Sequence, residues 1–187
     1  MDDGGFVFQG QGTLYNQTGQ SVYQGLWEDG TRSGNGTAWL EDGSIYSGNW
    51  VDDYPDGKGT YLFPDGTEYE GGFIRGKKHG QGTFKEADGF VSYDGEWKDG
   101  QRFGKGRVNK RDSSSYDGDW LDGKPHGNGM FTYPDGRVYT GTMKQGLRQG
   151  LGELRRSDGS IAYEGEWDKN LRHGKGKAYS ASGLIKF

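Results

Sequence analysis

The chain has 187 residues, a formal net charge of −4 and no cysteine. The absence of cysteine excludes disulfides, cysteine-ligated zinc and thiol catalysis, and it agrees with a reducing, intracellular compartment. Mild acidity argues against nucleic acid as a partner, because phosphate backbones select basic stripes. The chain has no long apolar run, and Met1–Gly5 is acidic, so we expect neither a membrane span nor a signal peptide.

Aromatic residues make up 14% of the chain and return at fixed intervals. A disordered chain would combine few aromatic residues with a high net charge, and neither applies here. We therefore expect an ordered chain with a thin, aromatic core.

A phrase of the form Tyr-x-Gly-x, usually followed by an aromatic residue, recurs every 23 or 24 residues. It begins at Tyr23, Tyr46, Tyr69, Tyr93, Tyr116, Tyr139 and Tyr163. A period of this length indicates a repeat array, in which each small unit buries its apolar face by stacking on its neighbours.

In chain order, residues 1–22 are expected to form an N-terminal capping or partial repeat, because Gly10–Leu14 match the second half of a repeat. Residues 23–177 then form seven full repeats. In the first, residues 23–28 and 34–38 alternate as strands do, residues 29–33 and 41–44 read as turns, and the repeat is a β-hairpin. Residues 178–187 are expected to close the array with Tyr179, Leu184, Ile185 and Phe187.

The predicted fold is therefore all-β: an elongated, single antiparallel sheet of stacked hairpins, with about 14 strands in a twisted and curved ribbon. A pair of glycines spaced two apart recurs in every second strand. The pairs are Gly34/Gly36, Gly57/Gly59, Gly80/Gly82, Gly104/Gly106, Gly127/Gly129, Gly150/Gly152 and Gly174/Gly176. Glycine in a strand marks a close approach, so we expect these pairs to form shallow pits that receive Tyr and Trp rings.

The other face of the predicted sheet carries charges of both signs. Asp94 and Glu96 are expected opposite Lys105 and Arg107, as are Glu164 and Glu166 opposite Lys175 and Lys177. Such cross-strand pairs contribute roughly 0.2–1 kcal/mol each, and we interpret this face as solvated.

The sequence offers no convincing catalytic, metal or cofactor site. His79, His126 and His173 recur 47 residues apart, which places them about 19 Å from one another in the sheet, too far for one metal, and we assign them to turns. Ser113–Ser115 have no nearby histidine, and Gly57–Thr60 lack the residue order of a phosphate loop. We expect no enzymatic activity and no cofactor.

Several segments resemble the MORN (membrane occupation and recognition nexus) repeat. They include Tyr163–Gly176, the stretch from Tyr69 to Gly82, and the Pro-Asp-Gly turn at Pro134–Gly136. The resemblance extends over roughly residues 10–183. It implies a trough of hairpins with an aromatic-lined groove, and a non-enzymatic scaffold in cilia, flagellar axonemes or other cytoskeletal structures, with a cytoplasmic, cytoskeleton-associated location.

The resemblance also implies protein partners, such as a helix or peptide held in the groove, and homodimer formation through terminal repeats. We expect the groove to be lined by the large side chains of repeats three to seven. These are Tyr69, Phe73, Tyr93, Trp97, Tyr116, Trp120, Tyr139, Met143, Tyr163 and Trp167. The alternative is that the same rings only fill the glycine pits, and both roles can hold together.

Three departures from the repeat pattern stand out. Tyr54-Pro55-Asp56 replaces the usual Arg-His, the link 109–115 lacks an Asp-Gly turn, and Met143 takes the place of Trp. A uniform array can be specific only where it deviates, so we hypothesise that repeats four to six determine which partner binds.

Two other functions stay open. A peripheral membrane tether would use a basic cluster, for which the best candidate is Arg102, Lys105, Arg107, Lys110 and Arg111. Strand alternation divides these residues between two faces, which disfavours this function. Binding of glycan or choline would need paired Trp and Tyr neighbours that the repeat phrase does not supply.

Overall fold

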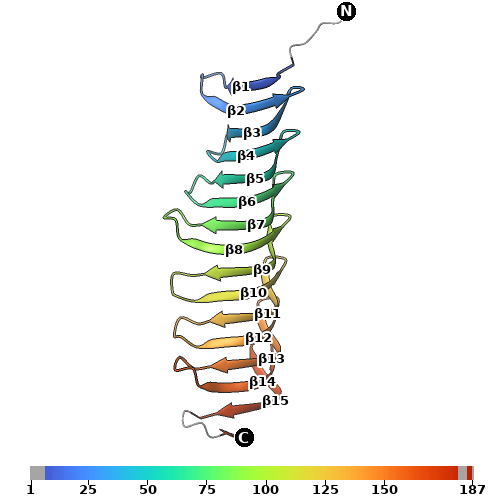
Figure 1. Cartoon of the computed structure of the whole chain (residues 1–187). Coiled ribbons are helices and arrows are strands. Elements are labelled where there is room, and N and C mark those ends of the chain that lie inside the picture. The colour runs from blue at the N-terminus through green and yellow to red at the C-terminus, as the bar shows by residue number, and fades with distance from the viewer. Residues whose placement is uncertain (1–6, 181–184, 187) are drawn as a thin grey trace, which may run out of the picture. The chain divides into compact units, whose positions relative to one another are not determined.

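The computed structural model describes residues 7–180 and 185–186. It divides into two compact units: Met1–Val91 with Trp97–Gly100, and Ser92–Glu96 with Gln101–Phe187. All regular structure in the described residues is β-strand (Figure 1), and neighbouring strands pair antiparallel in chain order from β1 to β7 and from β9 to β16. The predicted all-β fold of consecutive hairpins is confirmed.

The first unit contains seven complete strands. They are β1 (Gly10–Tyr15), β2 (Ser21–Glu28), β3 (Thr31–Trp39), β4 (Ile45–Val51), β5 (Tyr54–Leu62), β6 (Glu68–Ile74) and β7 (Lys77–Lys85). Strand β8 (Val91–Lys98) contributes residues to both units. The second unit continues with β9 (Gln101–Asn109), β10 (Ser115–Leu121), β11 (Lys124–Thr132), β12 (Val138–Lys144), β13 (Leu147–Arg155), β14 (Ile161–Asp168), β15 (Leu171–Tyr179) and β16 (Ile185–Lys186).

The turn inside each repeat is tighter than expected. In the first repeat only Asp29 and Gly30 connect the strands, with φ of 50° and 82°. Two residues with positive φ form the type I′ turn that matches the twist of a hairpin. Residues 31–33, which we predicted as turn, therefore begin β3, and that boundary was wrong.

The turn between repeats has one design throughout. In the first, the backbone N–H of Leu40 donates to the carbonyl of Ser44, and the N–H of Ser44 donates to the Asp42 carboxylate at 2.9 Å. The link without an Asp-Gly pair builds the same turn: Ser113 takes the glycine position with φ of 66°, and Asp112 accepts from the N–H of Ser114. The Asp-Gly pair is thus not required for this turn.

The second glycine of each pair behaves as predicted. A Cβ on Gly36 would lie 2.2 Å from the hydroxyl oxygen of Tyr23, because the Tyr ring lies directly over the glycine. Gly36 also pairs across the strands with Gly25, where a Cβ would come within 2.5 Å of the Gly36 Cα. The same three-residue arrangement recurs in every full repeat.

The first glycine of each pair has a different role, and the predicted pit there was wrong. Gly34 has φ of 55°, and the strand register shifts beside it, between Gly25 and Leu26. This β-bulge adds two residues, Gly34 and Asn35, to its strand, and glycine supplies the left-handed conformation that the bulge needs. All seven first glycines have φ between 53° and 93°.

The predicted terminal repeats are only partly visible. Strand β1 pairs with β2, with Gly12 opposite Gly25, as the second half of a repeat would, and Phe8 packs 5.0 Å from the ring of Trp27. At the other end β16 pairs with Ala178 and Tyr179. Leu184 and Phe187 lie outside the described residues, and the proposed boundaries of the terminal repeats stay a prediction.

Candidate functional site

One face of each unit's sheet carries the Tyr, the glycine and the large apolar residue of every repeat; we call it the aromatic face, and its opposite the polar face. Each repeat Tyr donates a hydrogen bond from its hydroxyl to the backbone carbonyl three residues later, at 2.9–3.0 Å. The acceptors are Leu26, Asn49, Gly72, Glu96, Asp119, Thr142 and Glu166. A buried phenol is thereby satisfied and its ring is fixed over the glycines.

Trp residues connect one repeat to the one before it. Trp50 stands edge-on to Tyr46 of its own repeat and Tyr23 of the preceding repeat, with ring centroids 5.0 and 5.5 Å apart. Its indole N–H donates to the carbonyl of Gly36 at 3.0 Å. The same bond joins Trp97 to Gly82, Trp120 to Gly106 and Trp167 to Gly152.

All ten residues predicted to line a groove lie on the aromatic face and belong to the core. Their relative exposure is between 0% and 6%. Tyr69, Phe73 and Trp97 pack in the first unit, and the other seven pack in the second. Burial of this kind agrees with the pit-filling role, and the binding role of these side chains stays a prediction.

The sequence interpretation missed the groups that cover these rings. Five cations lie over the aromatic rows: Arg32, Lys78, Arg102, Arg148 and Arg172. They occupy one repeat position, two residues before the Gly-x-Gly pair, and Pro55 and Pro125 occupy it in the other two repeats. The recurrence of Arg or Lys at one repeat position, replaced only by Pro, was the sequence signal that could have revealed these cations.

Lys78 has the most aromatic surroundings of the five. Its Nζ lies 4.8–5.2 Å from the centroids of four rings. Two of these, Tyr69 and Trp97, are core rings, and the other two, Phe63 and Phe84, are half-buried. Each cation–π contact contributes roughly 0.5–1 kcal/mol at an exposed site and more where water is excluded.

The next repeat's turn holds two of the arginines in place. Asp53 accepts from the backbone N–H and the Nε of Arg32 at 3.0 and 2.9 Å, while Asn170 accepts from the N–H of Arg148 at 2.9 Å. Arg148 also donates through Nη2 to the carbonyl of Asn170 at 2.7 Å. A guanidinium stacked on Trp167 at 4.1 Å and bonded in this way has a defined position.

Burial changes the acidity of the core phenols. It raises the pKa of Tyr93 to about 12, against the opposing effect of Arg102, and raises that of Tyr139 to about 12, against Arg148. Burial also raises the pKa of Tyr46 and Tyr116. These hydroxyls are therefore neutral hydrogen-bond donors at physiological pH and are poorly suited to proton transfer.

The polar face has charges of both signs, as expected. Glu164 lies opposite Lys177 with an ion pair of 3.3 Å, which confirms that pairing. Glu166, in contrast, lies opposite His173 because the bulge shifts the register, and it accepts from the backbone N–H of Lys175. Glu96 likewise accepts from the backbone N–H of Lys105.

Two of the three basic residues of β9, Lys105 and Arg107, have acidic neighbours on the next strand, β10. The Nζ of Lys105 bonds to Asp119, and Arg107 lies opposite Asp117. Arg102, by contrast, lies over the rings of Tyr93 and Trp120 on the aromatic face. The predicted division of the basic cluster between two faces is confirmed.

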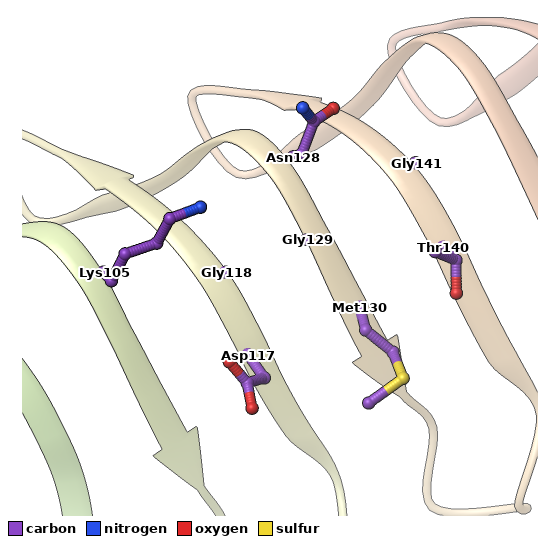
Figure 2. A pocket seen from close by; sticks show the side chains of 8 residues that line it. All are labelled: Lys105, Asp117, Gly118, Asn128, Gly129, Met130, Thr140 and Gly141. Carbon is purple, nitrogen blue, oxygen red and sulfur yellow. The ribbon is translucent and has the colours of Figure 1, made fainter.

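The polar face of the second unit has an open hollow of about 480 Å³. Its lining is Lys105, Asp117, Asn128, Met130, Thr140 and three glycines, Gly118, Gly129 and Gly141. The glycines form a line across β10, β11 and β12, and Met130, 43% exposed, stands beside them (Figure 2). The hollow lies over repeats five and six and reaches Lys105 of repeat four, so it coincides with the repeats where the sequence departs from the pattern.

The three histidines are strand residues, so their assignment to turns was wrong. His79 lies in β7, His126 in β11 and His173 in β15, each directly before the bulge glycine. The tight two-residue turns leave this position inside the strand. Across residues 7–180 and 185–186, the structure has no helix long and apolar enough to cross a membrane.

Comparison with known proteins identifies the repeat. The model of the MORN repeat family matches seven segments: residues 23–45, 46–68, 69–90, 93–109, 116–136, 139–161 and 163–185. No curated protein shows significant sequence similarity to the chain. Among solved structures, the chain is similar to the TCP domain of SAS-4 from Drosophila melanogaster, in complex with a proline-rich motif of Ana2. The two are 12% identical, with a TM-score of 0.49 over 94% of this chain and 88% of that chain.

Proposed function

The chain belongs to the MORN repeat family, and from this premise we propose that it is a non-enzymatic scaffold that binds protein partners through its aromatic face. The observation that carries the proposal is the row of cations held over the core rings. Arg and aromatic residues dominate the energetics of protein interfaces, because they combine a large apolar area with directed hydrogen bonds. On this face the two kinds of residue are stacked, and hydrogen bonds to the next turn fix Arg32 and Arg148.

The proposed contact surface differs from a bare aromatic groove. The ten core side chains are almost fully buried, so a partner touches mainly what lies above and beside them. In the first unit that is Lys78 with the half-buried Phe63 and Phe84. In the second it is Arg102 and Arg148, with the half-buried pair Phe131 and Tyr133, 4.7 Å apart.

We further propose that repeats four to six determine which partner binds. On the aromatic face, Pro125 replaces a cation and Met143 replaces Trp. On the polar face of the same repeats, the hollow beside Met130 interrupts the charge pattern. A double variant, Met143→Trp with Met130→Thr, makes these repeats resemble the others. It should lower the affinity for the natural partner, and unchanged affinity would contradict the proposal.

The experiment for the proposed function is affinity capture with the full chain and matched variants. Lys78→Ser with Arg148→Ser changes the aromatic face, and Lys58→Ser with Lys175→Ser removes two positive charges from the polar face. A partner of the aromatic face should be captured by wild type and by the polar-face variant but not by the aromatic-face variant. The same partner, once purified, should then bind the wild-type chain directly. Equal recovery with both variants would place the interface elsewhere and refute the proposal.

The cellular location is proposed from the family resemblance alone. We propose a cytoskeletal assembly, most specifically a cilium or flagellum, in which scaffolds of this family occur. Imaging a tagged copy in its native cell tests this directly: accumulation at the axoneme or basal body supports it, and a diffuse signal refutes it.

A further inference from the structure

We propose that the aromatic face selects an acidic, extended segment of its protein partner, whose carboxylates meet the cations stacked on the rings. This inference rests on the proposed function and adds the chemistry of the partner. It comes from the distribution of charge between the two faces, the way in which the cations are held, and their spacing along the sheet.

Charge is segregated between the faces. Among the described strand residues that share the aromatic face with the rings, every charged one is a cation. Register places Arg32 opposite Trp27, Lys78 opposite Phe73, Arg148 opposite Met143 and Arg172 opposite Trp167, and Arg102 stacks on Tyr93 and Trp120. The strand carboxylates, such as Glu68, Glu70, Asp117 and Glu164, lie on the polar face. The described strand residues of this face are therefore positive in sum although the protein has a net charge of −4, and of the five cations Arg32 is already ion-paired with the turn residue Asp53.

Hydrogen bonds and a ring contact hold Arg148 in place before a partner arrives. The Arg148 guanidinium lies 4.1 Å from the Trp167 ring and is bonded to Asn170, a neutral residue. The Arg172 guanidinium lies 4.8 Å from the Tyr163 ring and is exposed. Side chains that are already ordered lose little rotamer entropy on binding, and a guanidinium next to apolar rings forms strong charge-assisted bonds to a carboxylate.

The spacing of the cations favours an extended ligand. Arg148 in β13 and Arg172 in β15 are two strands apart, which is about 10 Å. A polyproline II segment has three residues per turn and rises about 3.1 Å per residue, so every third side chain lies on the same side about 9 Å from the last. An acidic residue at every third position would therefore place two carboxylates near the strand positions of Arg148 and Arg172, whereas Pro125 leaves a gap of four strands between Arg148 and Arg102.

The test uses two synthetic 18-residue peptides, six repeats of Glu-Leu-Pro and six of Gln-Leu-Pro, titrated into the full-length chain by calorimetry. Proline keeps both peptides extended, and they differ only in charge. The Glu peptide should bind about tenfold or more tightly than the Gln peptide, and its affinity should fall as salt is raised. Equal affinities, or no measurable binding of the Glu peptide, would overturn the inference.

Variants then locate the contact. Arg148→Gln and Arg172→Gln should each lower the affinity for the Glu peptide several-fold. Arg148→Lys, which keeps the charge, should retain most of the affinity. Lys105→Gln and Lys175→Gln are matched controls on the polar face and should bind like wild type. Thermal melts identify any variant that has lost its fold. If the polar-face controls weaken binding as much as the arginine variants, the segregation of charge is not what selects the ligand.

Two further results separate this inference from the proposed function. If affinity capture shows a partner that needs the aromatic face but the two peptides bind equally, the scaffold function holds and the acidic ligand is wrong. A second pattern of results would point to a membrane: the chain floats with phosphatidylserine vesicles, the Arg148→Gln variant no longer does, and the chain does not bind the Glu peptide. The same cations would then bind lipid headgroups, and the peptide inference is overturned.

Discussion

The indole N–H of Trp120 donates a 2.8 Å hydrogen bond to the carbonyl of Gly106, so a core side chain of one repeat satisfies the backbone of the repeat before it. Trp120→Phe keeps an aromatic ring but leaves this carbonyl without its indole donor. We expect a loss of about 1–3 kcal/mol in the free energy of unfolding, measured by chemical denaturation. Trp120→Phe with unchanged stability would mean that water replaces the indole without cost.

The sixth repeat provides the opposite experiment. Met143 has no N–H to offer the Gly129 carbonyl, whereas Trp167 of the next repeat bonds to Gly152 and stands edge-on to Tyr163 and Tyr139. Met143→Trp should stabilise the chain by about 1 kcal/mol, through one hydrogen bond and new ring contacts. Met143→Phe is the control, because it restores the ring without the donor and should give a smaller gain. A lower melting temperature for Met143→Trp would show that the site lacks room for an indole.

The glycines under the Tyr rings should tolerate no side chain. A Cβ on Gly152 would lie 2.4 Å from the hydroxyl of Tyr139 and within 2.6 Å of two ring carbons. Gly152→Ala must displace that ring and should cost about 3 kcal/mol or more. Gly146→Ala is a matched control, since Gly146 has φ of 84° and nothing within 4 Å of its Cβ position. Its strain alone should cost about 1–2 kcal/mol, so equal effects of the two variants would refute the packing argument.

The turn at Ser113 contains strain that glycine would remove. Ser113 has φ of 66°, whereas the equivalent Gly159 has φ of 83° in a turn with the same Asx hydrogen bond. Ser113→Gly should raise the free energy of unfolding by about 0.5–1 kcal/mol, after allowance for the greater freedom of glycine in the unfolded chain. Gly159→Ser is the mirror variant and should lower it by a similar amount. Two changes of the same sign in thermal melts would contradict this account.

The repeat period and the alternation of residues were enough to predict the hairpins and the shared face of Tyr23, Gly25 and Trp27. They could not distinguish the two glycines of a pair, because Gly34 and Gly36 look alike in sequence. Gly34 is needed for its positive φ at the bulge, whereas Gly36 is needed because the Tyr23 ring leaves no room for a side chain. Only the position of the bulge distinguishes these two roles.

The cation row was also harder to predict, because its place depends on the residue at which each strand begins. Arg102 lies on the aromatic face because a two-residue turn starts β9 at Gln101, whereas the predicted five-residue turn would have left it outside the strand. The register also shifts by two residues across the bulge within a repeat, so Glu166 meets His173 instead of Lys175. The length of the turn and the register shift at the bulge therefore determined where Arg102 and Glu166 lie. The buried rows of Tyr and Trp, in contrast, followed directly from the repeat.

Alkaline pH should unfold the chain through its core phenols. Burial raises the pKa of Tyr93 and Tyr139 to about 12, and raises that of Tyr23, Tyr46 and Tyr116 as well, whereas an unfolded Tyr titrates near 10. The folded state therefore holds protons that the unfolded state releases. The stability associated with them is fully present below pH 10 and is lost as the pH rises from 10 through 12.

Absorbance at 295 nm, which reports tyrosinate, and circular dichroism should change together above pH 10 in a steep, cooperative transition. Tyr139→Phe is the control: it removes one titrating group and the hydrogen bond to Thr142, so the variant should be less stable at pH 7 yet lose less stability per pH unit above 10. If tyrosinate instead appears gradually near pH 10 while the strand signal persists, these phenols reach solvent without unfolding, and the sealed packing of ring over glycine is refuted.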